Sequence, residues 1–183
     1  MKISGYIHKV LKERIPKGGF CIDATCGRGN DTIFLAECVG ENGTVTAIDI
    51  QQEAINSTCS VLEKHNIHNV RIFLNNHLNI DVYAAENSAD AVLFNLGYLP
   101  GGDHFIATSP QFTIPAIEKG LRILKPGGIM SLCIYSGADS GFAEKNALMR
   151  YLKTIDKNKY MVCVHEFYNL PNNPPLPVFI EKL

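Results

Sequence analysis

The chain has 183 residues, of which 46% are hydrophobic and 19% are charged. This composition is typical of a folded protein of ordinary size, so we expect a single domain over residues 1–183. The formal net charge of −1 excludes the general basic excess of proteins that bind long nucleic acids through their phosphates. Any contact with RNA is therefore expected to be local.

The sequence predicts neither a membrane segment nor a metal site. No apolar run approaches the roughly 18 to 20 residues that span a bilayer, and the basic amino terminus lacks the apolar stretch of a secretory signal. The six cysteines are not spaced as in zinc motifs, and His65 and His68 have no apparent third ligand. We expect a cytoplasmic protein with reduced thiols and no membrane contact.

Short β-rich runs alternate with helical runs along the chain, which predicts a parallel sheet covered by helices. Apolar residues at helical spacing predict helices over residues 3–11, 30–38, 54–65, 110–124 and 148–155. The β-rich runs predict strands over residues 20–24, 44–48, 70–74, 89–94 and 129–135, and a closing hairpin over 160–167 and 178–181. We expect a Rossmann-like, doubly wound α/β fold with a seven-stranded, mostly parallel sheet whose last strand is antiparallel.

One proline conflicts with the predicted helix over residues 110–124. Ser109 and Pro110 have the form of a helix cap followed by a proline in the first turn. Pro115 lies further inside, where a proline costs about 3 kcal/mol. We therefore expect this helix to be kinked or to begin near Thr113.

The run Asp23-Ala-Thr-Cys-Gly-Arg-Gly-Asn-Asp31 lies between the first predicted strand and the helix that follows it. Its glycines let the backbone turn tightly and approach a ligand closely. Ligands of open α/β sheets bind beyond the carboxyl ends of the strands, where Asp23 lies. Asp49 ends the second predicted strand at the same edge and suits the hydroxyls of a ribose. Together these features predict an adenosine ligand.

The turn favours S-adenosylmethionine over a dinucleotide. A dinucleotide fold would have a third glycine where Thr32 stands, so that a helix amino terminus could bind pyrophosphate. A carboxylate at Asp31 would repel pyrophosphate but attract the sulfonium and amino-acid portion of the methyl donor. The predicted cofactor-binding residues are Asp23, Thr25, Gly27, Gly29, Asn30 and Asp31 around the turn, Asp49 with Gln51 at the ribose, and Asn76 with His77 beside the adenine. His77 fits a surface residue equally well.

The segment Asn95–Asp103 follows the fourth predicted strand, where it is expected to face the transferable methyl group. The Asn95 amide oxygen can hold an amine, and Tyr98 can stack on a planar base. The Asn-x-x-Tyr spacing resembles the Asn-Pro-Pro-Tyr signature of amino-group methyltransferases without its prolines, although a structural asparagine in a strand-end turn is an alternative. An aliphatic amine is mostly protonated at pH 7, and Asp103 and His104 are candidate proton acceptors.

Four segments together resemble one group of small bacterial class I methyltransferases, over essentially the whole chain. They are Asp23–Asp31, Ala47–Gln51, Asn95–Asp103 and Asn172–Pro175. That group, labelled rRNA methylases, is understood as tRNA 5-aminomethyl-2-thiouridine methyltransferases. The resemblance implies methylation of the aminomethyl group at the tRNA wobble position, with the anticodon stem-loop as partner. Arg28 departs from it, because an asparagine is expected between the glycines.

The residues leave several functions open. The acceptor can instead be rRNA or a small-molecule amine. More distant alternatives are a nucleotide-dependent oxidoreductase and a non-catalytic protein that binds S-adenosylmethionine or RNA. Whether the chain forms a homodimer is also open.

Overall fold

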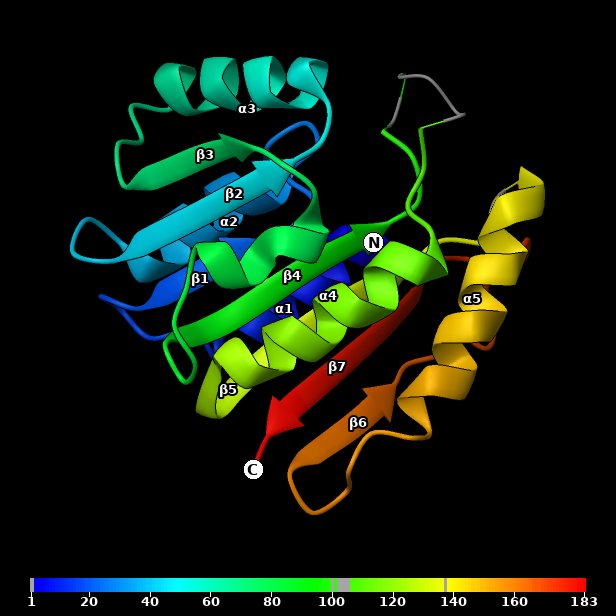
Figure 1. Ribbon diagram of the computed structural model, residues 1–183. Helices are drawn as coiled ribbons and strands as arrows, with labels where there is room; N and C mark the ends of the chain where they lie inside the picture. Colours follow the sequence, from blue (N-terminus) through cyan, green and yellow to red (C-terminus); the bar gives the residue numbers. More distant parts are fainter. Residues whose placement is uncertain (1, 100, 102–105, 137) are drawn as a thin grey trace.

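The computed structural model describes residues 2–99, 101, 106–136 and 138–183. Its strands form one seven-stranded sheet in the order β3-β2-β1-β4-β5-β7-β6 (Figure 1). They are β1 (Phe20–Asp23), β2 (Thr44–Asp49), β3 (Val70–Leu74), β4 (Ala89–Leu96), β5 (Leu124–Ile134), β6 (Tyr160–Val164) and β7 (Leu176–Lys182). Neighbouring strands are parallel except that β7 runs antiparallel to β5 and β6. The predicted fold class is confirmed.

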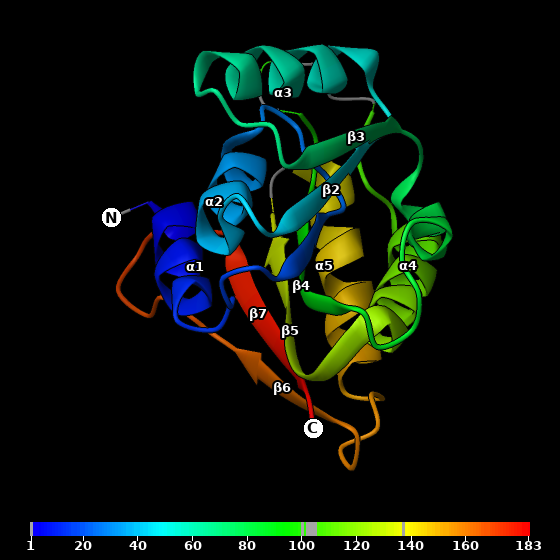
Figure 2. The ribbon, with the colours of Figure 1, turned by 90° about the vertical axis from the view of Figure 1, so that its left-hand side faces the viewer.

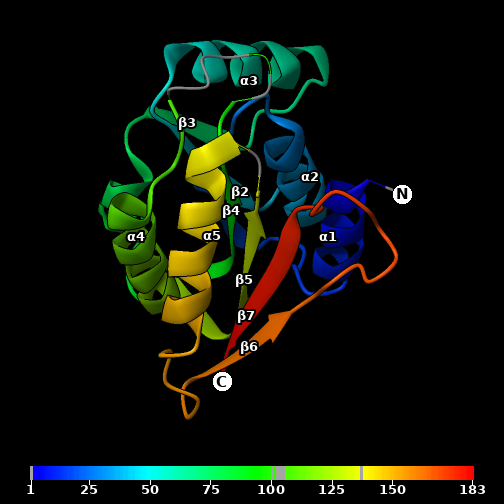
Figure 3. The same cartoon turned by 90° about the vertical axis from the view of Figure 1, so that its right-hand side faces the viewer.

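Helices cover both faces of the sheet (Figures 2 and 3). On one face lie α1 (Ile3–Lys12) and α2 (Asn30–Val39), and on the other lie α4 (Pro110–Ile123) and α5 (Ala138–Leu152). The helix α3 (Gln52–Lys64) packs beside β2 and β3, and the short 3₁₀ segment η1 (His77–Val82) packs against α4. No helix among the described residues is long and apolar enough to cross a membrane.

Each face of the sheet has its own apolar core, because successive side chains of a strand point to opposite faces. Ile22 of β1 belongs to the cluster that includes Ile117 of α4 and Leu148 of α5. Its neighbour Cys21 belongs to the second cluster, which includes Leu11 of α1 and Leu35 of α2. Burial on both faces holds the strand ends of β1, β2 and β4 side by side at one edge.

Several predicted boundaries differ from the structure: β5 begins at Leu124 rather than at residue 129, and α5 spans Ala138–Leu152 rather than 148–155. The predicted start of α4 at Pro110 is confirmed and the alternative start near Thr113 is wrong, because the Ser109 carbonyl oxygen accepts the amides of Phe112 and Thr113 at 3.0 and 2.9 Å. The first turn is therefore complete before Pro115, which interrupts the backbone bonding only once. The strand β4 continues to Leu96, so Asn95 lies within the strand and not after it.

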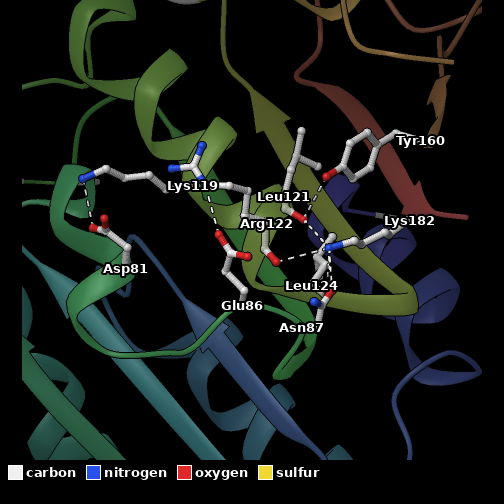
Figure 4. A network of polar contacts seen from close by, with 9 residues as sticks. All are labelled: Asp81, Glu86, Asn87, Lys119, Leu121, Arg122, Leu124, Tyr160 and Lys182. Atoms are coloured by element: carbon white, nitrogen blue, oxygen red, sulfur yellow. Dashed lines mark hydrogen bonds and ion pairs between the residues drawn. The ribbon is translucent and has the colours of Figure 1, made fainter. Parts of the chain in front are cut away.

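Lys182 at the end of β7 holds the carboxyl end of α4 (Figure 4). Its ammonium group donates to the carbonyl oxygens of Leu121, Arg122 and Leu124 at 3.3, 3.2 and 2.8 Å, and to Asn87 Oδ1 at 2.8 Å. The last carbonyls of a helix lack partners within the helix and carry partial negative charge. The lysine therefore stabilises the end of α4 at which β5 begins.

Candidate functional site

The turn between β1 and α2 is built from glycines that a side chain could not replace without strain. Gly27 has φ +51° and Gly29 has φ +83°, both in the left-handed region. A Cβ at Gly29 would lie 3.1 Å from Thr58 Cα of α3. The Thr58 hydroxyl also donates to the Gly27 carbonyl oxygen at 3.2 Å. The turn is therefore bare and is held against α3.

Asp23 lies beneath this turn and is fully buried. Its carboxylate accepts the Thr32 hydroxyl at 2.6 Å and the Thr25 amide at 3.3 Å. Burial, with a further contribution from the charge of Asp31, raises the Asp23 pKa to about 7. These contacts make Asp23 an organiser of the turn, and its contact with a ligand stays a prediction.

Asp49, at the end of β2, binds the same turn from the neighbouring strand. One of its oxygens accepts the Gly27 amide at 3.0 Å, and the other accepts the Gln51 amide at 3.0 Å. Partial burial raises its pKa. Because a carboxylate oxygen can accept two hydrogen bonds, both oxygens retain capacity for a ligand's hydroxyls.

Asp31 connects the turn to two other elements. One of its oxygens lies 2.5 Å from His8 Nε2 of α1, and the other accepts the Asn95 side-chain amide at 2.5 Å. The Asp31 side chain is 12% exposed, whereas Asn30 beside it is exposed. The structure therefore brings Asp31 and Asn95 together, although 64 positions separate them.

Asn95 lies directly beside the turn between β1 and α2, which is called the donor turn below because it is the predicted binding site of the methyl donor. Its backbone amide donates to the Thr25 hydroxyl at 2.7 Å. Further along, Leu99 is buried, and a Cβ at Gly27 would lie 3.5 Å from its Cδ1. Tyr98 is 40% exposed, and it forms a β-bridge with Ala107 that closes the loop after β4. The end of β4 thus borders the turn on the side predicted for the acceptor.

Asn76 and His77 follow β3 at the same edge of the sheet. The Asn76 side chain caps η1 by accepting the Leu78 amide at 2.8 Å. His77 is buried rather than on the surface, and burial lowers its pKa to about 4. Among the described residues, the buried side-chain atoms that lack a hydrogen-bond partner are His77 Nε2 and Ser136 Oγ, which follow β3 and β5. Both suit contacts with a ligand at this edge.

Asp103 and His104 lie outside the described residues. Arg28, which departs from the family pattern, pairs with Glu53 of α3 at 2.8 Å. No group of histidines, cysteines and acids that could hold a metal ion occurs in the part of the chain that the structure describes.

Sequence reasoning missed His8, the Thr32 hydroxyl and the Thr58 hydroxyl. The structure shows these through contacts that join separate elements: His8 with Asp31, Thr32 with Asp23, and Thr58 with the turn. A polar residue on an amphipathic helix is usually solvated, so His8 gave no signal by itself. Thr32 had a signal, because it interrupts the dinucleotide pattern next to a buried acid.

A family model described as "Putative rRNA methylase" matches residues 45–181 of the chain. The chain belongs to this family. A chloroplast tRNA (mnm(5)s(2)U34)-methyltransferase of Arabidopsis thaliana is 37% identical over 99% of this chain and 69% of its own length. A demethylmenaquinone methyltransferase of Geobacillus stearothermophilus is 25% identical over 77% of this chain and 55% of its own length.

Solved structures agree with this assignment. A putative rRNA-methylase of Clostridium thermocellum is 43% identical, with a TM-score of 0.96 over 100% of this chain and 98% of that one. A putative methyltransferase of Streptococcus mutans in complex with SAH is 36% identical, with a TM-score of 0.89 over 100% and 99% of the two chains. The chain is therefore an enzyme, a methyltransferase that depends on S-adenosylmethionine.

The residues at the edge of the sheet fit this cofactor. Gly27 and Gly29 carry no side chain that would keep a ligand from the backbone of the turn. Asp49 keeps acceptor capacity for ribose hydroxyls, and Asp31 offers a carboxylate to a cationic donor. The His77 nitrogen without a partner is available for a polar edge of the adenine. The individual contacts of these residues with the donor stay predictions.

Proposed function

We propose that this methyltransferase methylates the primary amine of 5-aminomethyl-2-thiouridine at the tRNA wobble position. One observation carries the proposal: the Asn95 carboxamide lies beside the donor turn with its nitrogen bonded to Asp31. Its oxygen is then available to accept a hydrogen bond from an amine. The similarity to the Arabidopsis tRNA methyltransferase over nearly the whole chain supports this acceptor.

On the donor side, S-adenosylmethionine supplies an electrophilic methyl group on a sulfonium. Asp49 binds the ribose hydroxyls with the acceptor capacity that its two backbone contacts leave. Asp31 attracts the positive charge of the donor's amino-acid end, with Asp23, Thr25 and Asn30 around it. Gly27 and Gly29 let the donor approach the backbone. The site thereby fixes the donor at the edge of β1 and β2.

On the acceptor side, the amine must lose a proton before its lone pair can attack. Asn95 Oδ1 accepts one of the remaining N–H groups and directs the lone pair toward the methyl carbon. The N–C bond then forms as the C–S bond breaks, and the methylated ammonium releases a proton. Tyr98, which is 40% exposed, stacks on the thiouracil ring. Most of the acceleration comes from holding nucleophile, methyl and sulfur in line.

The experiment supplies purified protein with S-adenosylmethionine and four acceptors. These are tRNA that carries 5-aminomethyl-2-thiouridine, the same tRNA with an unmodified wobble uridine, ribosomal RNA, and the free modified nucleoside. Mass spectrometry of the nucleosides should find the methylaminomethyl product only with the first tRNA. Methylation of ribosomal RNA, or equal turnover of the free nucleoside, would contradict the proposed substrate.

A further inference from the structure

A line of polar contacts connects the surface of α1 to the end of β4. His8 Nε2 lies 2.5 Å from Asp31 Oδ1, and Asp31 Oδ2 accepts the Asn95 side-chain amide at 2.5 Å. The contacts span 23 and 64 positions of the sequence. Both oxygens of Asp31 are therefore engaged, one on each side.

The His8 ring is held in a defined plane. It stacks on Phe34 of α2, with the ring centroids 3.9 Å apart and the planes 2° from parallel. Phe34 lies three positions after Asp31, on the same side of α2. The stacking therefore fixes the position from which Nε2 meets the carboxylate, and a carboxylate bonded on both sides cannot turn about its terminal torsion.

The orientation of Asp31 decides the orientation of the Asn95 carboxamide. An amide has donors on its nitrogen and acceptors on its oxygen. When the nitrogen is bonded to Asp31, the oxygen points away from it. We infer that His8 is a positioning residue for methyl transfer, which holds Asp31 so that Asp31 keeps the Asn95 oxygen directed at the acceptor amine. This inference rests on the proposed function, because that function places the amine at Asn95.

His8 is not needed to attach α1 to the rest of the protein. Ile7 and Leu11 on the same helix are buried in the core. Arg14, just after the helix, pairs with Glu181 of β7 at 2.7 Å. The His8 side chain itself is 25% exposed. A change at His8 should therefore alter Asp31 without loosening the helix.

Two substitutions distinguish the hydrogen bond made by His8 Nε2 from the stacking of the His8 ring. His8→Phe keeps an aromatic ring on Phe34 but cannot bond Asp31. His8→Gln places an amide nitrogen near the position of Nε2 and can donate to Asp31. We expect His8→Phe to lower kcat about tenfold, the loss of one charge-assisted hydrogen bond. The KM for the tRNA should change less than about twofold, and His8→Gln should recover most of kcat because it restores the bond.

A spectroscopic measurement tests the same contact without any acceptor. The side-chain ¹⁵N amide signal of Asn95 can be identified by its loss in Asn95→Ala. It should shift in His8→Phe and stay near its wild-type position in His8→Gln. His68→Phe is the control, because His68 is bonded only to exposed Asn66 among the described contacts and should leave the signal unchanged.

Wild-type kcat and an unmoved amide signal in His8→Phe would overturn the inference. Equal loss of kcat in His8→Gln and His8→Phe would also overturn it, because the bond to Asp31 would then not be the cause. If the wild-type protein fails to methylate the tRNA, the proposed function falls. The amide signal in that case still decides whether His8 orients Asn95.

Discussion

A β-carbon at Gly29 would lie 3.1 Å from the Cα of Thr58 and 3.2 Å from its hydroxyl oxygen. The donor turn and α3 are therefore in direct backbone contact, and the Thr58 hydroxyl donates to the turn at Gly27. This contact explains why the second glycine of the turn is needed for packing as well as for its positive φ.

Gly29→Ala should destabilise the protein more than Gly18→Ala. Both glycines have a positive φ, +83° and +75°, but nothing lies within 4 Å of a Cβ at Gly18. The matched control carries only the backbone strain, about 1 kcal/mol. Gly29→Ala adds the clash with Thr58 and should lose at least about 1 kcal/mol more in denaturant unfolding. Equal losses of unfolding free energy in the two variants would show that α3 moves away from the added β-carbon without a measurable cost.

Asp49→Asn should weaken binding of S-adenosylmethionine. The carboxamide is uncharged and has only one oxygen to accept hydrogen bonds. Its NH₂ group would face one of the two backbone N–H groups that donate to the carboxylate in the wild-type protein. Hydrogen bonds to charged groups are worth about 1.5–3 kcal/mol, so Kd should rise about tenfold to a hundredfold in isothermal titration. Asp81→Asn is the control, because Asp81 pairs with Lys119 on the surface. Unchanged affinity in Asp49→Asn would remove the ribose assignment.

Asn95→Ala should separate donor binding from transfer. It removes the carboxamide that faces the acceptor while Asp49 and the glycine turn stay in place. The Kd for S-adenosylmethionine should change less than about threefold, whereas kcat should fall at least about a hundredfold because the amine is no longer held in line. Single-turnover assays with the modified tRNA measure both. Transfer that persists in this variant would show that Asn95 does not hold the amine.

Asp23→Asn should change how stability depends on pH. Burial raises the Asp23 pKa from 3.8 to about 7. Between these values the folded protein keeps a proton that the unfolded chain has released, so this contribution to stability is complete at low pH and is lost as pH rises toward 7. The asparagine variant has no such proton. Its melting temperature relative to wild type should increase by several degrees between about pH 4.5 and 7.5 without the donor. A constant difference would contradict the raised pKa.

Lys182→Met should lower stability without affecting the site. It removes the ammonium group that binds three carbonyls at the end of α4 and Asn87 (Figure 4). We expect a loss of about 1–2 kcal/mol in denaturant unfolding, since carbonyls at a helix end lose their partner. The Kd for S-adenosylmethionine should stay at the wild-type value. Weaker donor binding in a variant that is still folded would contradict this prediction, because it would show that the contacts of Lys182 influence the donor turn.

Element types were predictable because they follow from local patterns. The apolar spacing of Ile7 and Leu11 predicted α1, and the buried run before Asp23 predicted β1, as the structure has them. Boundaries were less secure, because a neighbouring strand or a carbonyl cap can extend an element. Pairing with β5 carries β4 through Leu96, and the Ser109 carbonyl starts α4 at Pro110.

The candidate site divides in the same way. The sequence by itself determined that Asp23, Asp49 and the glycine turn meet at one edge, because parallel strands all end there. Only the tertiary structure decided that Asp23 is buried beneath the turn and that His8, Asp31 and Asn95 form one line. Those contacts depend on how α1 and α2 pack against β4, and side chains so far apart in sequence leave no local pattern of their meeting.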